Sequence, residues 1–441
     1  MSGEYPLSRR SVLLGGAAGL GGLAGCAGTD FDLGGTPSFD RARLQRIADR
    51  PIPATDRPPL LQVPRRRIET HRERARELLA ALPPEPTVSN GAVTSRLAEL
   101  IHRARTVITE DEPSASRWDQ LENARYARSS AAEAATAYRA AKGILDPSTL
   151  ATRRGSLRSE LSRFRRHWGY RGADPFEALA VHGRLEDLVG SVESATRIGV
   201  IPGQPTAAPL RLGEIAAALE RGRAALGDAR AIRARYLDAR RDTQPYRAVF
   251  ATAGSELEDP HRQEYARIAD YLGEEAPDRI GSPGRPAAFL LVTFEQAVGR
   301  WREMARESRS KERWAAAVRQ RAVHWVYLEG ALPMIRAIRD GAYRPPESAA
   351  AIEEAKAEAV QRLEEARAVD PRPFAALLAR RPRSHIGEGD RYVGGPDGSV
   401  EAVYRGYAAY ATGMHVAEAV PSVVDAMAGL LRRLARRRVE N

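Results

Sequence analysis

The sequence predicts an all-α protein in which one or more helix bundles follow a disordered N-terminal tether. Apolar residues recur at helical spacing along most of the 441 residues. Alanine is abundant and only 6% of residues are aromatic, which favours closely packed helices. Alternating runs of β-branched residues, which are typical of strands, are almost absent. A single cysteine leaves no intramolecular disulfide, so packing must stabilise the fold.

The first 25 residues form a segment that we interpret as a cleaved export signal. Arg9 and Arg10 precede an apolar run that is too short and too rich in glycine for a membrane span of about 20 apolar residues. A basic start, a short apolar centre and small residues before the end are typical of a secretory signal peptide. The doubled arginine resembles the twin-arginine export signal.

The end of this segment resembles the lipobox of lipoproteins, which is carried here by Leu23, Ala24, Gly25 and Cys26. The resemblance implies that Cys26 becomes the first residue of the mature chain and carries the lipid. A single lipid chain contributes about 0.8 kcal/mol per buried methylene and holds only reversibly, so stable attachment needs a second contact. We therefore expect an exported protein that membrane lipid anchors to the outer face of the cytoplasmic membrane.

The charge of the chain indicates which partners the mature protein attracts. The net charge is +11, and removal of residues 1–25 leaves +10. The strong preference for arginine over lysine, together with the signal, resembles exported proteins of haloarchaea or high-GC bacteria. We expect anionic headgroups or acidic surface polymers as partners. Nucleic acid is not expected, because arginines alternate with acidic residues along the helices and export removes the protein from the cell's nucleic acids.

The next segment, residues 26–64, predicts a tether rich in proline and glycine, with one short helical piece near residues 38–50. We expect the folded part to begin near Arg65. A proline-rich break at 201–210 divides it into helical domains or subdomains of residues 65–205 and 206–441. Further breaks are predicted at 277–286 and 381–399.

Individual helices are marked by apolar stripes and by Asp-Pro pairs. One stripe contains Leu157, Leu161, Phe164 and Trp168, and a second contains Trp314, Val318, Trp325, Leu328 and Leu332. We interpret both stripes as core. Asp-Pro pairs at 146–147, 174–175, 259–260 and 370–371 predict helix starts, because aspartate caps free amides and proline fits the first turn.

Standard catalytic motifs are absent from the sequence. It contains no phosphate-binding P-loop, no His-Glu-x-x-His and no Gly-x-Ser-x-Gly, so no catalytic residue is predicted. Near the C-terminus, Gly413, His415 and Glu418 spell G-x-H-x-x-E. Residues three apart share a helix face, so His415 and Glu418 can meet one metal ion. This motif resembles that of the imelysin family of exported helical proteins. The resemblance implies metal binding or metallopeptidase activity.

A second His-x-x-Glu pair, His385 and Glu388, falls in the expected loop at 381–399. We hypothesise that the two pairs, His385 with Glu388 and His415 with Glu418, converge on one divalent metal. This metal is the single candidate cofactor. The alternative for His415 and Glu418 is a histidine hydrogen-bonded to a glutamate one turn later. For His385 and Glu388, the glycines at 387 and 389 are expected to remove the helical geometry that would align the pair.

The C-terminal segment predicts an amphipathic helix. Its apolar stripe contains Val423, Met427, Leu430, Leu431 and Leu434, and its last turns contain Arg432, Arg433, Arg436, Arg437 and Arg438. Arginines at this end complement the helix dipole, as expected for a terminal helix docked on the core. The alternative is a second membrane contact through anionic headgroups.

These observations predict an exported, lipid-anchored helical protein with a binding or scaffolding role at the extracytoplasmic membrane face. The alternative is an imelysin-like metal-binding protein or metallopeptidase. The sequence indicates neither the ligand nor a protein partner.

Overall fold

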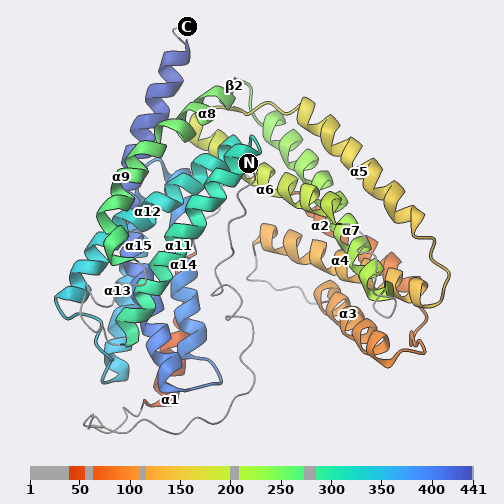
Figure 1. The fold of residues 1–441 in the computed structure, drawn as a ribbon, viewed down its shortest axis with the longest axis horizontal. Helices are drawn as coiled ribbons and strands as arrows, with labels where there is room; N and C mark the ends of the chain where they lie inside the picture. The colour runs from red at the N-terminus through yellow and green to blue at the C-terminus, as the bar shows by residue number, and fades with distance from the viewer. Residues whose placement is uncertain (1–38, 55–62, 110–115, 199–207, 273–284, 440–441) are drawn as a thin grey trace, which may run out of the picture. The chain divides into compact units, whose positions relative to one another are not determined.

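The computed structural model describes residues 39–54, 63–109, 116–198, 208–272 and 285–439. This part is almost entirely helical (Figure 1), which confirms the all-α prediction. Arg9, Arg10 and the predicted lipobox with Cys26 lie outside the described residues. So do most of the predicted breaks at 201–210 and 277–286.

The first helices are α1 (Arg41–Ala48), α2 (Arg65–Ala80), α3 (Gly91–Thr109), α4 (Arg117–Ala141), α5 (Ser148–Arg166), α6 (Pro175–Arg197) and α7 (Ala208–Asp238). They are followed by α8 (Arg247–Glu256), α9 (Glu258–Ile268), the short 3-10 helix η3 (Ala269–Tyr271), α11 (Arg285–Ser310), α12 (Trp314–Arg339), α13 (Ala349–Ala368), α14 (Arg372–Val393) and α15 (Val400–Val439). Two short strands, β1 (Arg171–Gly172) and β2 (Gln244–Pro245), pair antiparallel with Arg171 opposite Pro245.

The Asp-Pro pairs mark helix starts at three of the four predicted places. Asp174 accepts hydrogen bonds from two amides in the first turn of α6, and Asp146 accepts one at the start of α5. Helix α14 begins directly after the pair at 370–371. The pair at 259–260 lies inside the first turn of α9, which begins at Glu258.

Both predicted apolar stripes belong to the core. Leu157, Leu161 and Phe164 are buried on α5, while Trp168 follows the helix end and stacks on Tyr170 with ring centroids 5.3 Å apart. In the α12 stripe, Val318 and Leu328 are buried. The other members are half-buried and pack against the same core: Trp314, Trp325 and Leu332. The interpretation of the tryptophans as core residues is therefore confirmed.

The interior of the first helices contains a charged network. Asp228 on α7 is fully buried and lies 3.0 Å from Nε2 of His71 and 2.9 Å from Nε of Arg67. The guanidinium of Arg128 donates to Glu220 at 2.6 and 2.9 Å and lies 3.1 Å from Nδ1 of His71. Burial lowers the pKa of His71. Since both of its ring nitrogens are engaged, we interpret this network as a link between α2, α4 and α7.

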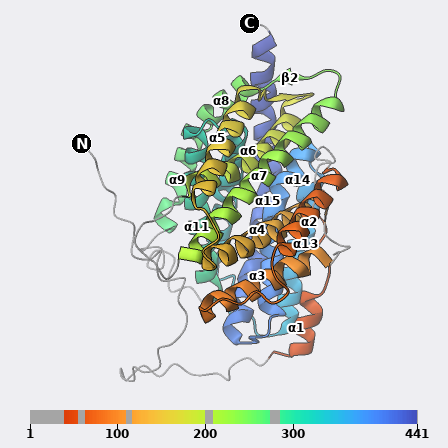
Figure 2. The ribbon, with the colours of Figure 1, turned by 90° about the vertical axis from the view of Figure 1, so that its right-hand side faces the viewer.

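Helices α11 to α15 share a second core (Figures 1 and 2), and α14 packs antiparallel on α15 with very close backbones. A Cβ atom at Gly389 would lie 2.4 Å from the Tyr410 ring, and one at Gly413 would lie 2.9 Å from Ile386. The predicted break at 381–399 is therefore wrong as far as Val393. The glycines there allow close helix contact and do not end the helix.

Helix α15 is docked on the core, as one of the two interpretations of its sequence predicted. Its apolar stripe is buried: Val423, Met427, Leu430, Leu431 and Leu434. Among the described helices, it alone is long and apolar enough to cross a membrane, over Val400–Arg437. However, 61% of its most apolar stretch is buried inside the protein. That burial is typical of a core helix.

Part of the predicted tether is folded. The helical piece expected near residues 38–50 is α1, which places Leu44 and Ile47 in a core with α13 and α14. The compact body therefore begins at Phe39, earlier than the start near Arg65 that we expected. Two apolar residues three apart were the signal in the sequence.

Replacement of Gly389 by alanine tests the close contact of α14 with α15. The added methyl group overlaps the Tyr410 ring, so we expect Gly389→Ala to lower the free energy of unfolding by about 1–3 kcal/mol in urea titrations. Gly299 on α11 is the matched control, because nothing lies within 4 Å of its added Cβ. Gly299→Ala should be neutral or stabilising by up to about 1 kcal/mol. Equal effects would contradict the contact.

Candidate anion-binding site

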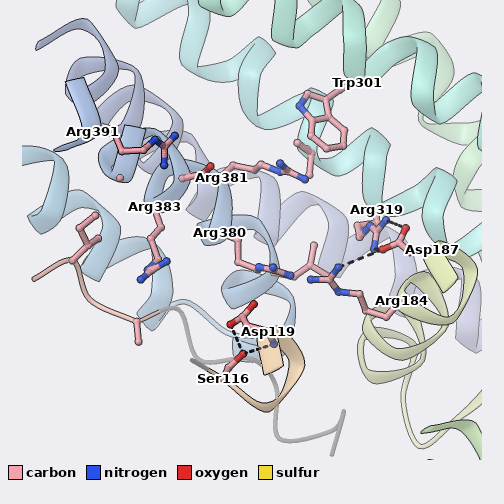
Figure 3. Close-up of a pocket in the computed structure, with 16 residues that line it drawn as sticks. Ser116, Asp119, Arg184, Asp187, Trp301, Arg319, Arg380, Arg381, Arg383 and Arg391 are labelled. Carbon is pink, nitrogen blue, oxygen red and sulfur yellow. Dashed lines mark hydrogen bonds and ion pairs between the residues drawn. The ribbon is translucent and has the colours of Figure 1, made fainter. Parts of the chain in front are cut away.

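A cavity of about 810 Å³ lies between the N-terminal turns of α4, the middle of α6, and helices α11, α12 and α14 (Figure 3). Its charged lining consists of Arg184, Arg319, Arg380, Arg381, Arg383 and Arg391, with Asp119 and Asp187. Among the described lining residues, arginines outnumber acids by six to two, so this part of the lining is strongly positive.

Helix α14 supplies four of these six arginines. Arg380, Ser384, Gly387 and Arg391 follow one another at spacings of four, three and four, which places them on one side of a helix. The opposite side carries Ile386 and the glycine contacts with α15. This face was not predicted, because residues 381–399 were expected to form a loop. The arginine spacing was the signal that a helical interpretation would have used.

Arg381 is a strongly desolvated cation of the cavity. Its guanidinium lies 4.1 Å from the ring centroid of Trp301, and burial lowers its pKa to about 10. It therefore remains charged at neutral pH. Among the described residues, no carboxylate forms an ion pair with it. A buried charge without a counterion is costly, so this position favours the arrival of an anion.

The cavity aspartates are already engaged. Asp187 binds Arg319 through two hydrogen bonds of 2.6 and 2.9 Å and lies 3.5 Å from Arg184. Burial lowers the pKa of Arg319, but the nearby carboxylates of Asp187 and Glu186 together raise it more, so the net shift is upward. Asp119 accepts a hydrogen bond of 2.5 Å from Ser116 at the start of α4. Asp187 is therefore committed to Arg319 and Arg184, and four arginines of α14 line the cavity as well.

The wall of the cavity is held where α6 crosses the start of α12. Glu186, next to Asp187, is buried and accepts hydrogen bonds from the amides of Ala315 and Ala316, which are free amides of the first turn of α12. Tyr170 donates to the same carboxylate at 2.5 Å. The consecutive residues Glu186 and Asp187 thus cap α12 and bind Arg319 on the same helix.

The predicted His-x-x-Glu pairs both form on helix faces. Nδ1 of His385 lies 3.6 Å from Glu388 on α14, and Nδ1 of His415 lies 3.8 Å from Glu418 on α15. Burial lowers the pKa of His415 to about 4, so its imidazole is neutral. The members of each pair therefore lie near one another on one helix, at distances longer than a hydrogen bond.

The pairs do not converge on a single site. The hydroxyl of Tyr327 lies 2.7 Å from Nε2 of His385, and that of Tyr343 lies 2.6 Å from Nε2 of His415. Burial raises the pKa of Tyr327 to about 12 and that of Tyr343 further, so both hydroxyls keep their protons. Over the described ranges, no three His, Cys, Asp or Glu side chains are grouped to hold a metal ion. Metal binding by these pairs stays a prediction.

The C-terminal arginines have mixed surroundings. Arg433 binds Glu256 at 2.6 Å, and Arg432 lies 5.5 Å from the ring centroid of Phe176. Arg436 and Arg437 are exposed, and the side chain of Arg438 lies outside the described residues. A membrane contact of this cluster stays a prediction.

Comparison with known proteins finds two similar regions. Residues 66–242 match the family model of a domain of unknown function, DUF8262, and residues 247–429 match that of a second domain of unknown function, DUF8264. Neither curated proteins nor solved structures give a match.

The cavity draws on both matched regions. Arg184 and Asp187 lie in the first, and Arg319 and Arg381 lie in the second. Small-molecule sites occur preferentially between such units. We predicted a domain boundary at the break at 201–210, and helix α7 follows that break. This helix packs along α4 and α6 and lies in the first matched region.

The buried carboxylate of Glu186 makes stability depend on pH. Burial raises its pKa from 4.5 to about 8, although its hydrogen bonds lower it. The folded state therefore binds this proton more tightly than the unfolded state, and stability falls as pH rises from 4.5 towards 8. We expect Glu186→Gln to flatten this slope in urea titrations between pH 5 and 8. Glu73→Gln, at an exposed position, should keep the wild-type slope, and equal slopes in both variants would contradict the assignment.

Proposed function

We propose that this chain is an exported, lipid-anchored binding protein that holds a phosphate-bearing anion in its arginine cavity at the outer face of the cytoplasmic membrane. The observation that carries the proposal is Arg381, a desolvated guanidinium stacked on Trp301 with no carboxylate partner among the described residues.

The chemistry of the cavity suits phosphate. A guanidinium presents a planar fork of donors that matches phosphate oxygens in two-point fashion. Several arginines on one helix face, here Arg380, Arg381 and Arg391, can share the charges of a ligand with more than one anionic group. The volume of about 810 Å³ falls in the range of small-molecule sites, about 300–1,000 Å³.

Binding fits the cavity better than catalysis does. Among the described lining residues, the two aspartates are engaged by arginine or by serine, and none is a histidine. A general acid or base needs a titratable group within reach of the substrate. The cavity lining offers charge and shape, which are the requirements of a receptor.

The same chemistry has two sources at a membrane face: a soluble phosphate compound and the headgroup of an anionic lipid. A lipid on Cys26 keeps the protein close to both. The C-terminal arginines Arg436 and Arg437 are the proposed second contact with headgroups, which a singly lipidated protein requires.

Calorimetric titration of residues 27–441 with pyrophosphate tests the site. We expect binding by the wild type and at least tenfold weaker binding by Arg381→Met, because a charge-assisted hydrogen bond contributes about 1.5–3 kcal/mol. Arg391→Met, at an exposed position of the wall, should weaken binding without disturbing Trp301. Arg372→Met, an exposed change on the same helix outside the cavity, is the control and should bind as the wild type does.

A second arm distinguishes the two sources of phosphate. If the ligand is a headgroup, the wild type should co-sediment with vesicles of phosphatidylglycerol but not with vesicles of phosphatidylcholine. The Arg381→Met variant should then not co-sediment with either kind of vesicle. Pyrophosphate binding with equal vesicle binding of both proteins identifies a soluble ligand. No pyrophosphate or vesicle binding, or no difference between Arg381→Met and Arg372→Met in either assay, would refute the site.

Attachment through Cys26 is tested by intact-mass analysis and cell fractionation in the native host. The wild type should start at Cys26, carry the added mass of lipid and sediment with membranes. Cys26→Ala should lack the lipid, because alanine has no thiol to alkylate, and should leave the membrane fraction. A wild-type mass equal to that of the unmodified chain would contradict the proposal.

A further inference from the structure

The segment that follows the predicted lipid site is built into the wall of the arginine cavity. We call residues 39–54 the strap; it contains α1 and the extended residues after it. Figures 1 and 2 show α1 beside the lower ends of α13 and α14. Leu44 is 3% and Ile47 1% exposed, so the apolar face of α1 is fully packed.

A buried lysine holds the end of α1. Lys356 on α13 is 3% exposed, and its Nζ donates to the carbonyl oxygens of Ile47, Ala48 and Arg50 at 2.7, 3.0 and 2.8 Å. It also pairs with Asp390 on α14 at 2.8 Å. A cation at the last carbonyls of a helix satisfies its free acceptors and complements its dipole.

Ion pairs add to this attachment on the outer side. Glu353 on α13 binds both Arg43, at 3.0 Å, and Arg50. Arg41 donates to the carbonyl oxygen of Pro396 at 3.1 Å. These exposed contacts contribute little each, so the buried lysine and the apolar face of α1 provide most of the attachment.

The last residues of the strap face the cavity. Ile52 and Ala54 are part of its lining. Nε of Arg383, one of the cavity arginines, donates to the carbonyl oxygen of Pro53 at 3.1 Å. A Cβ atom at Gly387 would touch the side chain of Ile52 at 3.7 Å, so the strap lies directly on the arginine face of α14.

We propose that anion binding in the cavity and seating of the strap are coupled, so that each stabilises the other. This inference rests on the proposed function of the cavity. The seated strap holds Arg383 and partly shields Ile52 from water, and it forms one side of the cavity. Exclusion of water strengthens the attraction between arginines and an anion. By linkage, a ligand that binds the seated form more tightly must favour seating by the same factor.

The coupling gives the strap a regulatory role. It connects the cavity to the chain that leads back to Cys26, the predicted anchor. Any force or partner that lifts α1 from α13 and α14 would release the anion, and a bound anion would hold α1 in place.

The test uses a variant that unseats the strap without substituting any residue that lines the cavity. Leu44→Ser/Ile47→Ser removes the apolar face of α1, and Ala42→Ser/Gln45→Ser makes two equivalent changes on its exposed face. In titrations of residues 27–441 with pyrophosphate, we expect at least tenfold weaker binding by the first variant and wild-type binding by the second.

Hydrogen exchange measures the reciprocal effect in the wild type. Saturating pyrophosphate should slow exchange of the amides of residues 44–50, and Arg381→Met should show no such slowing at the same concentration. If the wild type binds pyrophosphate but exchange of the strap is unchanged, or if the unseated variant binds equally well, the coupling is wrong and the anion site stands. If the wild type binds neither pyrophosphate nor anionic vesicles, the site itself is wrong and the coupling falls with it.

Discussion

The packing of α6 across the first turn of α12 is the constraint on which the cavity depends. The first amides of a helix have no partner within it, and here Glu186 supplies one from another helix. The next residue, Asp187, binds Arg319 one turn further along α12. A carboxylate with a raised pKa is a costly group to bury, and the cost is offset by joining two helices at the wall of a binding cavity.

Arginine has two different roles in this molecule. Inside the first helices, Arg67 and Arg128 meet Asp228 and Glu220, and the charges stabilise the packing of α2, α4 and α7. On the cavity face of α14, Arg381 has an aromatic neighbour but no acid among the described residues. The contrast between neutralised and unneutralised guanidinium groups distinguishes the candidate site from the structural networks. Composition alone does not show it, because both kinds contribute equally to the net charge.

The sequence predicted the features that depend on local spacing. The stripe from Leu157 to Phe164, the cap at Asp174 and the meeting of His415 with Glu418 follow from helical period and capping rules. The break at 381–399 was predicted because glycine and proline usually interrupt helices, and it was wrong as far as Val393. Gly389 instead accommodates Tyr410, a residue of another helix, so its role depends on a tertiary contact that the local pattern does not contain. The arginine cavity was missed for the same reason, since its walls come from helices far apart in the chain.

Anion binding by the α14 face together with α6 and α12 is the proposal on which the function of the cavity depends. A crystal structure of residues 27–441 grown with pyrophosphate tests it most directly. We predict a bound phosphate within hydrogen-bond distance of the Arg381 guanidinium, in a cavity still walled by Ile52 and Asp187. Pyrophosphate found only on arginines outside the cavity, with Arg381 unoccupied at saturating concentration, would contradict the claim.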